Sequence, residues 1–175
     1  MNEFDVSDNF NTSELYIVST GIADRTVFHG SKVIVEIPEI RTVRKSKDFG
    51  QGFYCTNMKK QAIRWATRFG NGNVTEYKYV QCTLLKILYF SKMTEEWLDF
   101  IIDCRLGKPH IYDIVEGPMA DDEVFLSVQD YIRGNITREA FWELVKFRYP
   151  THQISFHTFN AINTLTYTGY EAVIK

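Results

Sequence analysis

The chain has 175 residues, of which 45% are hydrophobic and 15% aromatic. This length fits a single domain with a large core, which needs neither disulfides nor a structural metal to fold. Twenty basic and twenty-two acidic residues give a net charge of −2. That balance argues against a nonspecific nucleic-acid binder but allows a local basic patch.

The sequence pattern carries no sign of a membrane or export address. No hydrophobic run approaches the roughly 20 residues of a membrane span, and the polar, acidic N-terminus does not resemble a signal peptide. The three cysteines lack metal-ligand spacing and are expected to be reduced: Cys55, Cys82 and Cys104. We therefore expect a cytoplasmic protein that does not associate with membranes.

Residues 1–24 are expected to form an N-terminal extension, and residues 25–175 a single domain. The pattern predicts a strand over 25–29, an irregular connection over 33–46 and a strand over 50–56. A helix follows over 57–69, with Asn57 as its N-cap and Gly70 as its C-terminal stop. Four apolar side chains recur at helical spacing and are expected to pack inward: Ala62, Trp65, Ala66 and Phe69.

After a long β-type run over 74–88, the middle of the chain is expected to be helical. Helices are predicted over 94–106, 121–133 and 137–147, with Thr94 and Asp121 as N-caps. Their inward side chains are Trp97, Leu98, Ile101, Ile102, Val124, Phe125, Val128, Ile132, Phe141, Leu144 and Val145. The chain ends with a strand over 153–157, a helical turn over 159–163 and a strand over 165–175 that turns at Gly169. Strands at both ends and helices between them favour an α+β fold with mostly antiparallel pairing.

Two glycine-bearing segments are candidates for ligand binding. His29 ends the first strand, and Gly30 lets a ligand approach the backbone because it has no Cβ. Residues 47–54 carry two glycines followed by an aromatic pair. This pattern fits a ligand loop with Tyr54 as a stacking platform, and it equally fits a glycine-rich corner whose aromatics pack in the core.

Polar residues in the second half of the chain give two further candidates. Asp122 either supports the start of a helix beside the cap Asp121 or provides a carboxylate to a cleft. Alternation places Gln153, Ser155 and His157 on one face of a strand. That face is either solvated or directed into a binding site.

Five motifs, taken in chain order, resemble the DUF3990 family, which is similar to ADP-ribosyltransferases. They are His-Gly-Ser at 29–31, Asp-Phe-Gly-x-Gly-Phe-Tyr at 48–54, Gln-Ala-x-x-Trp-Ala at 61–66, Tyr-Asp-x-Val-x-Gly-Pro-x-Ala-Asp-Asp at 112–122 and Gln-Ile-Ser-Phe at 153–156. The resemblance covers about residues 27–165. It implies an ADP-ribosyltransferase-like α+β fold in which two small antiparallel sheets form an NAD cleft, with packed helices.

The resemblance also implies a catalytic triad of a His or Arg, a Tyr or Ser, and a Glu. His29 would bond the adenosine-ribose hydroxyls, the Gly30 backbone would hold the nicotinamide amide, and Tyr54 would stack on the nicotinamide ring. Gln153 stands where the Glu is expected; it keeps a hydrogen bond but lacks the charge, and Asp122 is the alternative carboxylate. The implied NAD-binding set is His29, Gly30, Ser31, Asp48, Gly50, Gly52, Phe53 and Tyr54.

The function implied by the resemblance is transfer of ADP-ribose from NAD to a macromolecular acceptor. A toxin or defence-effector role beside a neutralising antitoxin protein is implied in the same way. Two alternatives stay open: an NAD glycohydrolase with water as acceptor, and a catalytically silent module that binds a nucleotide or a protein.

Overall fold

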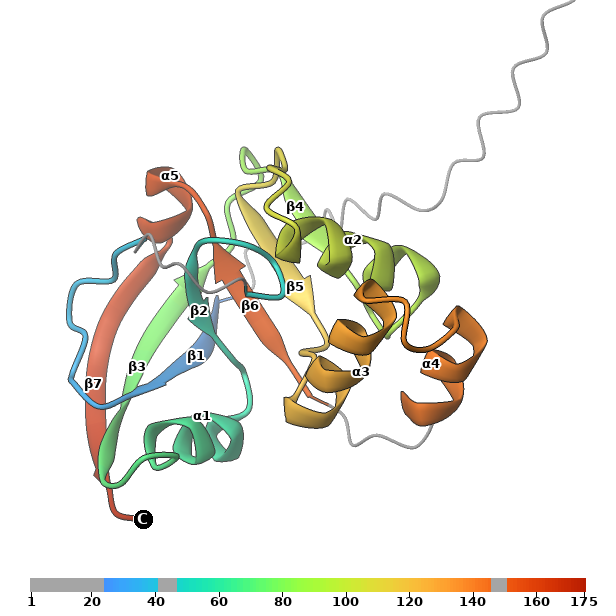
Figure 1. The fold of residues 1–175 in the computed structure, drawn as a ribbon. Helices are drawn as coiled ribbons and strands as arrows, with labels where there is room; N and C mark the ends of the chain where they lie inside the picture. Colours follow the sequence, from blue (N-terminus) through green and yellow to red (C-terminus); the bar gives the residue numbers. More distant parts are fainter. Residues whose placement is uncertain (1–23, 41–46, 146–150) are drawn as a thin grey trace, which may run out of the picture.

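The computed structural model describes residues 24–40, 47–145 and 151–175, and for Asp122 the backbone alone. This part of the chain forms an α+β fold with two sheets and flanking helices (Figure 1). Sheet A consists of three antiparallel strands in the order β1 (Asp24–Ser31), β3 (Gly72–Val80) and β7 (Leu165–Val173). Sheet B consists of four strands in the order β2 (Phe53–Cys55), β6 (Gln153–Phe156), β5 (Ile114–Gly117) and β4 (Ile87–Tyr89).

Sheet B is mixed, which corrects the prediction of two antiparallel sheets. Strand β4 pairs with β5 in parallel, while the other pairs of this sheet are antiparallel. The reason is the connection between them, because the chain leaves β4, forms helix α2 (Glu95–Arg105) and returns as β5. A crossover of this length, carrying a helix, joins parallel neighbours.

The two sheets meet at a single residue pair and then diverge. Phe28 of β1 and Thr56, just after β2, exchange backbone hydrogen bonds of 2.8 and 2.9 Å. In the described residues this is an isolated bridge and not a continuous ladder. The ends of β1 and β2 beyond this bridge therefore face each other across a split.

Helices cover the outer faces of both sheets (Figure 1). Helix α1 (Lys59–Ala66) packs on sheet A through β1 and β3. Helices α2, α3 (Asp122–Ile132) and α4 (Arg138–Val145) flank sheet B, and the short α5 (Phe159–Ile162) precedes β7. One apolar cluster lies between the sheets around Tyr77 and Phe156, and a second lies between sheet B and its helices around Trp97 and Phe141. None of these helices combines the length and hydrophobicity that a membrane crossing requires.

The N-caps and apolar spacing in the sequence correctly predicted the helices that flank sheet B. Thr94 caps α2 by accepting a hydrogen bond from the Trp97 backbone N–H at 3.3 Å, and Asp121 caps α3 in the same way through Val124 at 3.2 Å. Most of the predicted inward residues are buried or half-buried. Phe125 and Leu144 are exposed instead, and the ring of Phe125 lies against the Arg105 guanidinium.

Helix α1 differs most from its prediction. Its N-cap position is taken by Met58, which makes no side-chain cap hydrogen bond, and not by Asn57; the helix ends at Ala66, three residues early. Trp65 and Phe69 are 51% and 76% exposed. The helix approaches sheet A too closely to admit large side chains on this side: a Cβ on Gly30 would lie 2.1 Å from the Ala62 backbone oxygen.

Two strand predictions also need correction. The run predicted over 74–88 is divided between β3 in sheet A and β4 in sheet B, and the strand predicted over 50–56 is limited to Phe53–Cys55. Gly169 does not turn the chain; it lies inside β7, where a register shift opposite Glu76 and Tyr77 forms a bulge. The predicted segment over 41–46 and the end of the helix predicted to 147 fall outside the described residues.

Candidate functional site

His29 lies in the split between β1 and β2. Its Nδ1 is 2.7 Å from the backbone oxygen of Tyr54, and its ring stacks on Phe53 with centroids 4.6 Å apart. Because a carbonyl oxygen only accepts, Nδ1 carries the proton in this contact, so Nε2 is the acceptor nitrogen of the neutral ring. The imidazole is therefore held in one orientation across the split.

Gly30 continues the edge of β1 beyond the bridge to Thr56. Backbone groups of residues two apart in a strand point to the same side, so the N–H and C=O of Gly30 point to the side on which Phe28 bonds Thr56. A primary amide, with its NH₂ donors and its carbonyl acceptor, can pair with both groups of such an edge. The neighbouring Ser31 hydroxyl donates to Val33 O at 2.5 Å within the following loop.

Tyr54 projects to the other face of sheet B, over the turn that precedes β2. Its hydroxyl donates to Gly50 O at 2.6 Å and accepts from the Phe49 N–H at 3.2 Å. Gly50 has a φ of +80°, which explains the glycine in this turn. Burial raises the pKa of the Tyr54 hydroxyl well above its usual value, with a smaller contribution from the nearby Asp48. The Lys47 ammonium lies 4.4 Å from the ring centroid.

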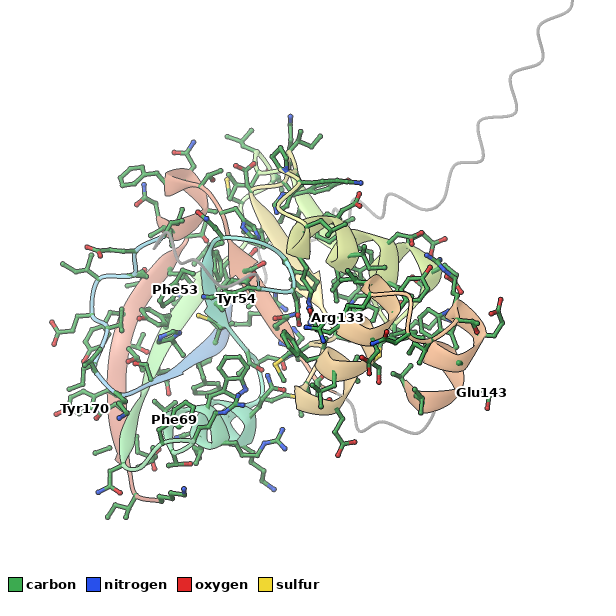
Figure 2. The ribbon with its side chains drawn as sticks, viewed as in Figure 1. Phe53, Tyr54, Phe69, Arg133, Glu143 and Tyr170 are labelled. Carbon is green, nitrogen blue, oxygen red and sulfur yellow. The ribbon has the colours of Figure 1, made fainter. Side chains whose placement is uncertain are left out.

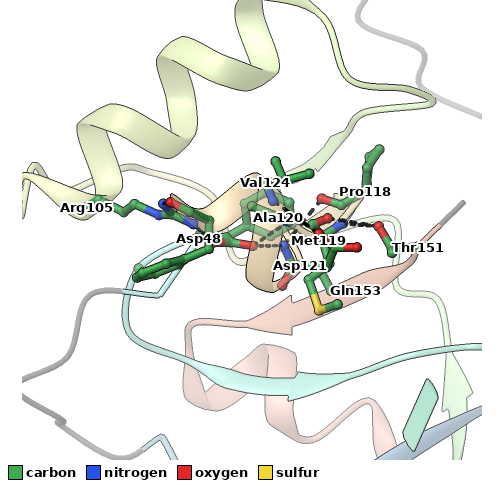
Figure 3. A network of polar contacts seen from close by, with 12 residues as sticks. Asp48, Arg105, Pro118, Met119, Ala120, Asp121, Val124, Thr151 and Gln153 are labelled. Atoms are coloured by element: carbon green, nitrogen blue, oxygen red, sulfur yellow. Dashed lines mark hydrogen bonds and ion pairs between the residues drawn. The ribbon is translucent and has the colours of Figure 1, made fainter. Parts of the chain in front are cut away.

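Asp48 is the centre of a buried polar network (Figure 3). Its carboxylate accepts hydrogen bonds from Arg105 at 2.5 Å, from the Ala120 backbone N–H at 2.8 Å and from Gln153 Nε2 at 3.0 Å. The side chains of Arg105 and Asp48 are 1% and 9% exposed. Three donors on one carboxylate are what a buried charge requires.

The Gln153 side chain has its amide nitrogen directed at two acceptors, Asp48 and the carbonyl of Pro118, which lies 3.4 Å away. This fixes the orientation of the amide. Within the described ranges no hydrogen bond to Gln153 Oε1 is formed, so that oxygen is the acceptor left for another group. Gln153 and Ser155 are buried; the reading of their strand face as a solvated surface is therefore wrong.

Beside this network lies a histidine pair, of which the sequence had placed His157 on the candidate strand face and had not singled out His110. His157 Nδ1 donates to Gln51 O at 2.6 Å, Nε2 lies 2.8 Å from the Ser155 hydroxyl, and the His110 ring packs edge-on with centroids 4.5 Å apart. The pKa of His157 is lowered to about 4, mainly by burial; His110 and Lys47 act in the same direction, and the hydrogen bond to Gln51 opposes them. The imidazole is therefore neutral at pH 7.

The structure divides the predicted site residues between two faces of sheet B. His29, Gly30, Ser31 and Phe53 lie at the split. Asp48, Gly50, Gln153 and the Tyr54 side chain lie on the helix-covered face. Gly52 is also there, and a Cβ on it would lie 2.8 Å from Phe156 O. Asp122 is the first residue of α3, and its side chain lies outside the description.

All of these residues lie within one matched region. The family model described as "Protein of unknown function (DUF3990)" matches residues 25–167, from the second residue of β1 into β7. The chain belongs to the DUF3990 family. The predicted membership is thus confirmed, while the likeness to ADP-ribosyltransferases stays a prediction. No curated protein matches the chain.

The DUF3990 fold holds a second buried charge, Glu116, that sequence reasoning missed. It accepts two hydrogen bonds from Arg25, at 2.7 and 2.5 Å, and one from His152 Nε2 at 2.8 Å. His152 Nδ1 accepts from the Asn57 backbone N–H at 3.1 Å, which fixes the tautomer. Burial alone would raise the pKa of Glu116, but the bonds from His152 and Arg25 outweigh it and lower the pKa to about 2. A charged residue inside the apolar run of β5 was the available signal.

Arg105 of this DUF3990 domain was missed for a similar reason. It lies four residues after Ile101, on the predicted apolar stripe of α2. A charge at a stripe position indicates a buried partner. In the described residues no three His, Cys, Asp or Glu side chains gather to hold a metal ion.

Two surface hollows of the DUF3990 domain lie away from these residues. One of about 240 Å³ lies on sheet A beside Lys59 and Glu171, and one of about 620 Å³ lies between the 36–40 loop and α5. Neither is lined by His29, Tyr54 or Gln153. The candidate site is thus defined by polar geometry, not by a large hollow.

Proposed function

We propose that this protein is an NAD-dependent ADP-ribosyltransferase that binds NAD along the split between β1 and β2. The observation that carries the proposal is the contact of His29 across the split, 2.7 Å from the Tyr54 backbone oxygen. It orders an imidazole beside the backbone edge of Gly30. An ordered ring and a paired donor and acceptor suit the ribose hydroxyls and the carboxamide of NAD.

The chemical step is a substitution at C1 of the nicotinamide ribose. The bond from C1 to the nicotinamide nitrogen breaks, nicotinamide leaves with the electron pair, and positive charge develops on the sugar ring. The acceptor's nucleophilic atom then forms a bond to C1, and its proton passes to the solvent. Groups that bind this charged state more tightly than NAD itself accelerate the step.

On this proposal the nicotinamide ribose extends from the split to the helix-covered face of sheet B, where its 2′-hydroxyl donates to Gln153 Oε1. The amide nitrogen of Gln153 is engaged by Asp48 at 3.0 Å, which leaves Oε1 as the acceptor oxygen. The negative charge that Gln lacks is one hydrogen bond away on Asp48, where Arg105 balances it. We expect this arrangement to stabilise the cationic sugar less than a direct carboxylate would.

A catalytically silent nucleotide-binding module is the second candidate. The observation that favours it is the pairing of Asp48 with Arg105, whose side chain is 1% exposed, because the network contains no uncompensated negative charge. On this alternative His29 still binds NAD, and nicotinamide is not released.

The test is single-turnover release of nicotinamide from labelled NAD, with and without cell extract. Gln153→Ala is expected to slow release by roughly 10- to 100-fold while NAD affinity changes little, because the interaction strengthens as charge develops. His29→Ala is expected to weaken NAD binding by about tenfold, the loss of one good hydrogen bond. Gln129→Ala on α3 is the control for Gln153→Ala.

A paired exchange sharpens this test. Gln153→Glu alone places two carboxylates together and removes a donor, so it should fail to help. Asp48→Asn combined with Gln153→Glu exchanges donor and acceptor in this hydrogen bond and moves the charge one bond closer to the ligand, but it costs the bond from the Ala120 N–H. Urea unfolding must therefore first show that the double variant is folded. This double variant should release nicotinamide faster than wild type. If NAD binding depends on His29 but no nicotinamide is released, the silent module is favoured. If neither the wild-type protein nor the double variant binds NAD, both functions are refuted.

A further inference from the structure

The solvent-facing side of α1 combines two bare aromatic rings with three cations. This α1 face consists of Lys60, Arg64 and Trp65 on the helix and of Arg68 and Phe69 in the turn that follows it, all of which are exposed. Phe69 lies at the end of α1, away from β2 and its labelled residues (Figure 2). The apolar side of the helix is already used, since Ala62 and Ala66 are buried against sheet A.

The charge around this face has one sign. From Thr56 to Thr75 the chain has four basic residues and no acidic residue, although its net charge is −2. Of the four, Lys59 pairs with Glu171 at 2.7 Å on the side toward sheet A, where Glu76 also lies. The Arg68 guanidinium lies 5.5 Å from the Phe69 ring centroid. The side with Lys60 and Arg64 is therefore a local positive surface, and Arg68 lies next to it.

The two rings are exposed because of the backbone and not because the core is loosely packed. A Cβ on Gly72 would lie 2.2 Å from the Ala66 backbone oxygen, and the contact at Gly30 is equally close. No room is left beneath the helix for an indole or a phenyl ring. Large exposed aromatics beside cations are a common recognition surface, so the pairing points to a ligand.

We propose that the α1 face binds single-stranded nucleic acid. Phosphates would lie against the cations, and unpaired bases would stack on Trp65 and Phe69, the combination used by proteins that bind single strands without sequence preference. An anionic membrane is less well matched, because membrane-surface helices bury a broad apolar face and that side of α1 is occupied by sheet A. An acidic polypeptide would use the cations but leave the rings without partners.

The position of the α1 face suggests what the bound nucleic acid is used for. Helix α1 follows β2 directly and packs on β1 at Gly30, so the elements that carry the α1 face and the split are neighbours in the fold. The strand would then serve as the ADP-ribose acceptor, a role that rests on the proposed function. Binding itself does not depend on NAD.

The test is fluorescence anisotropy of a labelled 12-nucleotide oligothymidine, measured without NAD across a series of salt concentrations. Trp65→Ala is expected to weaken binding by about tenfold, as loss of one stacked base does. Each of Lys60→Gln, Arg64→Gln and Arg68→Gln should weaken binding and reduce the salt dependence by about 0.7 in log–log slope. Matched controls are Phe159→Ala on α5 and Arg133→Gln after α3, an exposed Phe and an exposed Arg elsewhere.

The proposal is supported if the α1-face variants lose affinity and the controls do not. It is overturned if wild type does not bind the oligonucleotide, or if the controls lose as much affinity as the α1-face variants. It is also overturned if the same variants lose binding to phosphatidylserine vesicles while oligonucleotide binding is absent. Because NAD is left out, failure of nicotinamide release leaves this result unaffected, and the two proposals fail separately.

Discussion

At the scale of single residues, the polar interior is organised by Asp48. It receives donors from a helix, a loop and a strand that are far apart in the sequence, from Arg105 to Gln153. The sequence marked Asp48 and Gln153 as candidate site residues through separate motifs. Their direct contact, across 105 positions, is a property of the fold alone.

Removal of the Asp48 charge should destabilise the protein strongly. Asp48→Asn leaves the buried Arg105 guanidinium without a counter-ion, and loss of one member of a buried pair costs about 3–5 kcal/mol. Asp99→Asn is the matched control, since Asp99 pairs with Arg138 at the surface and is 59% exposed; its expected cost is about 1 kcal/mol or less. Urea unfolding at pH 7 measures both. Equal losses of unfolding free energy in the two variants would show that the Asp48–Arg105 pair contributes no more than a surface ion pair.

At the scale of elements, the contact between α1 and sheet A determines what the helix can bury. Gly30 and Gly72 let the helix backbone approach the strands, and only alanines fit between them. This contact lies next to the split, because Gly30 directly follows His29, which contacts Tyr54 across it. Gly30, which the motif assigns to ligand binding, thus also packs against α1, while its backbone N–H and C=O point toward the split.

Gly30→Ala tests this contact. The added methyl group would meet the Ala62 backbone oxygen at 2.1 Å, and because backbone cannot rotate away, α1 must shift. Overpacking of this kind costs about 1–3 kcal/mol. Thr26→Ala, at an exposed position on the same strand, provides the control. Unchanged unfolding of Gly30→Ala in urea would mean that α1 is not packed on β1 in this manner.

At the scale of the whole molecule, buried titratable groups link separate parts of the fold. Glu116 of sheet B binds Arg25 of sheet A and His152, and His157 joins β6 to the 47–52 turn through Gln51. Both groups have a folded-state pKa below the ordinary value, about 2 for Glu116 and about 4 for His157. Each therefore contributes stability that is present at neutral pH and lost in acid.

Acid should destabilise the protein in two successive steps. As pH falls from 6.5 to 4, the unfolded chain takes up the proton that the folded His157 resists; from 4.5 to 2 the same holds for Glu116. Each loss is on the order of 3 kcal/mol. The free energy of unfolding, measured in urea from pH 7 to pH 2.5, should depend less on pH between 6.5 and 4 in His157→Gln. It should depend less on pH below 4.5 in Glu116→Gln. A pH profile unchanged by both substitutions would contradict the assignment.

The sequence by itself determined the α+β class, the family, and the caps and apolar stripes beside sheet B. The class and the family follow from the order of elements and motifs along the chain. The caps and stripes depend on neighbours within about four residues, which the sequence displays directly. The caps Thr94 and Asp121 and the buried Trp97 and Phe141 are examples.

Only the tertiary structure decided which side of α1 faces solvent, the parallel pairing of β4 with β5, and the partners of Gln153. Periodicity predicted Trp65 and Phe69 to be inward, because it cannot include the glycines of a strand that arrives beneath the helix. It left the face of Gln153 open between solvent and a site, because Asp48 and Arg105 come from distant segments. Contacts between residues far apart in the sequence set burial and polar pairing, and those contacts exist only once the chain has folded.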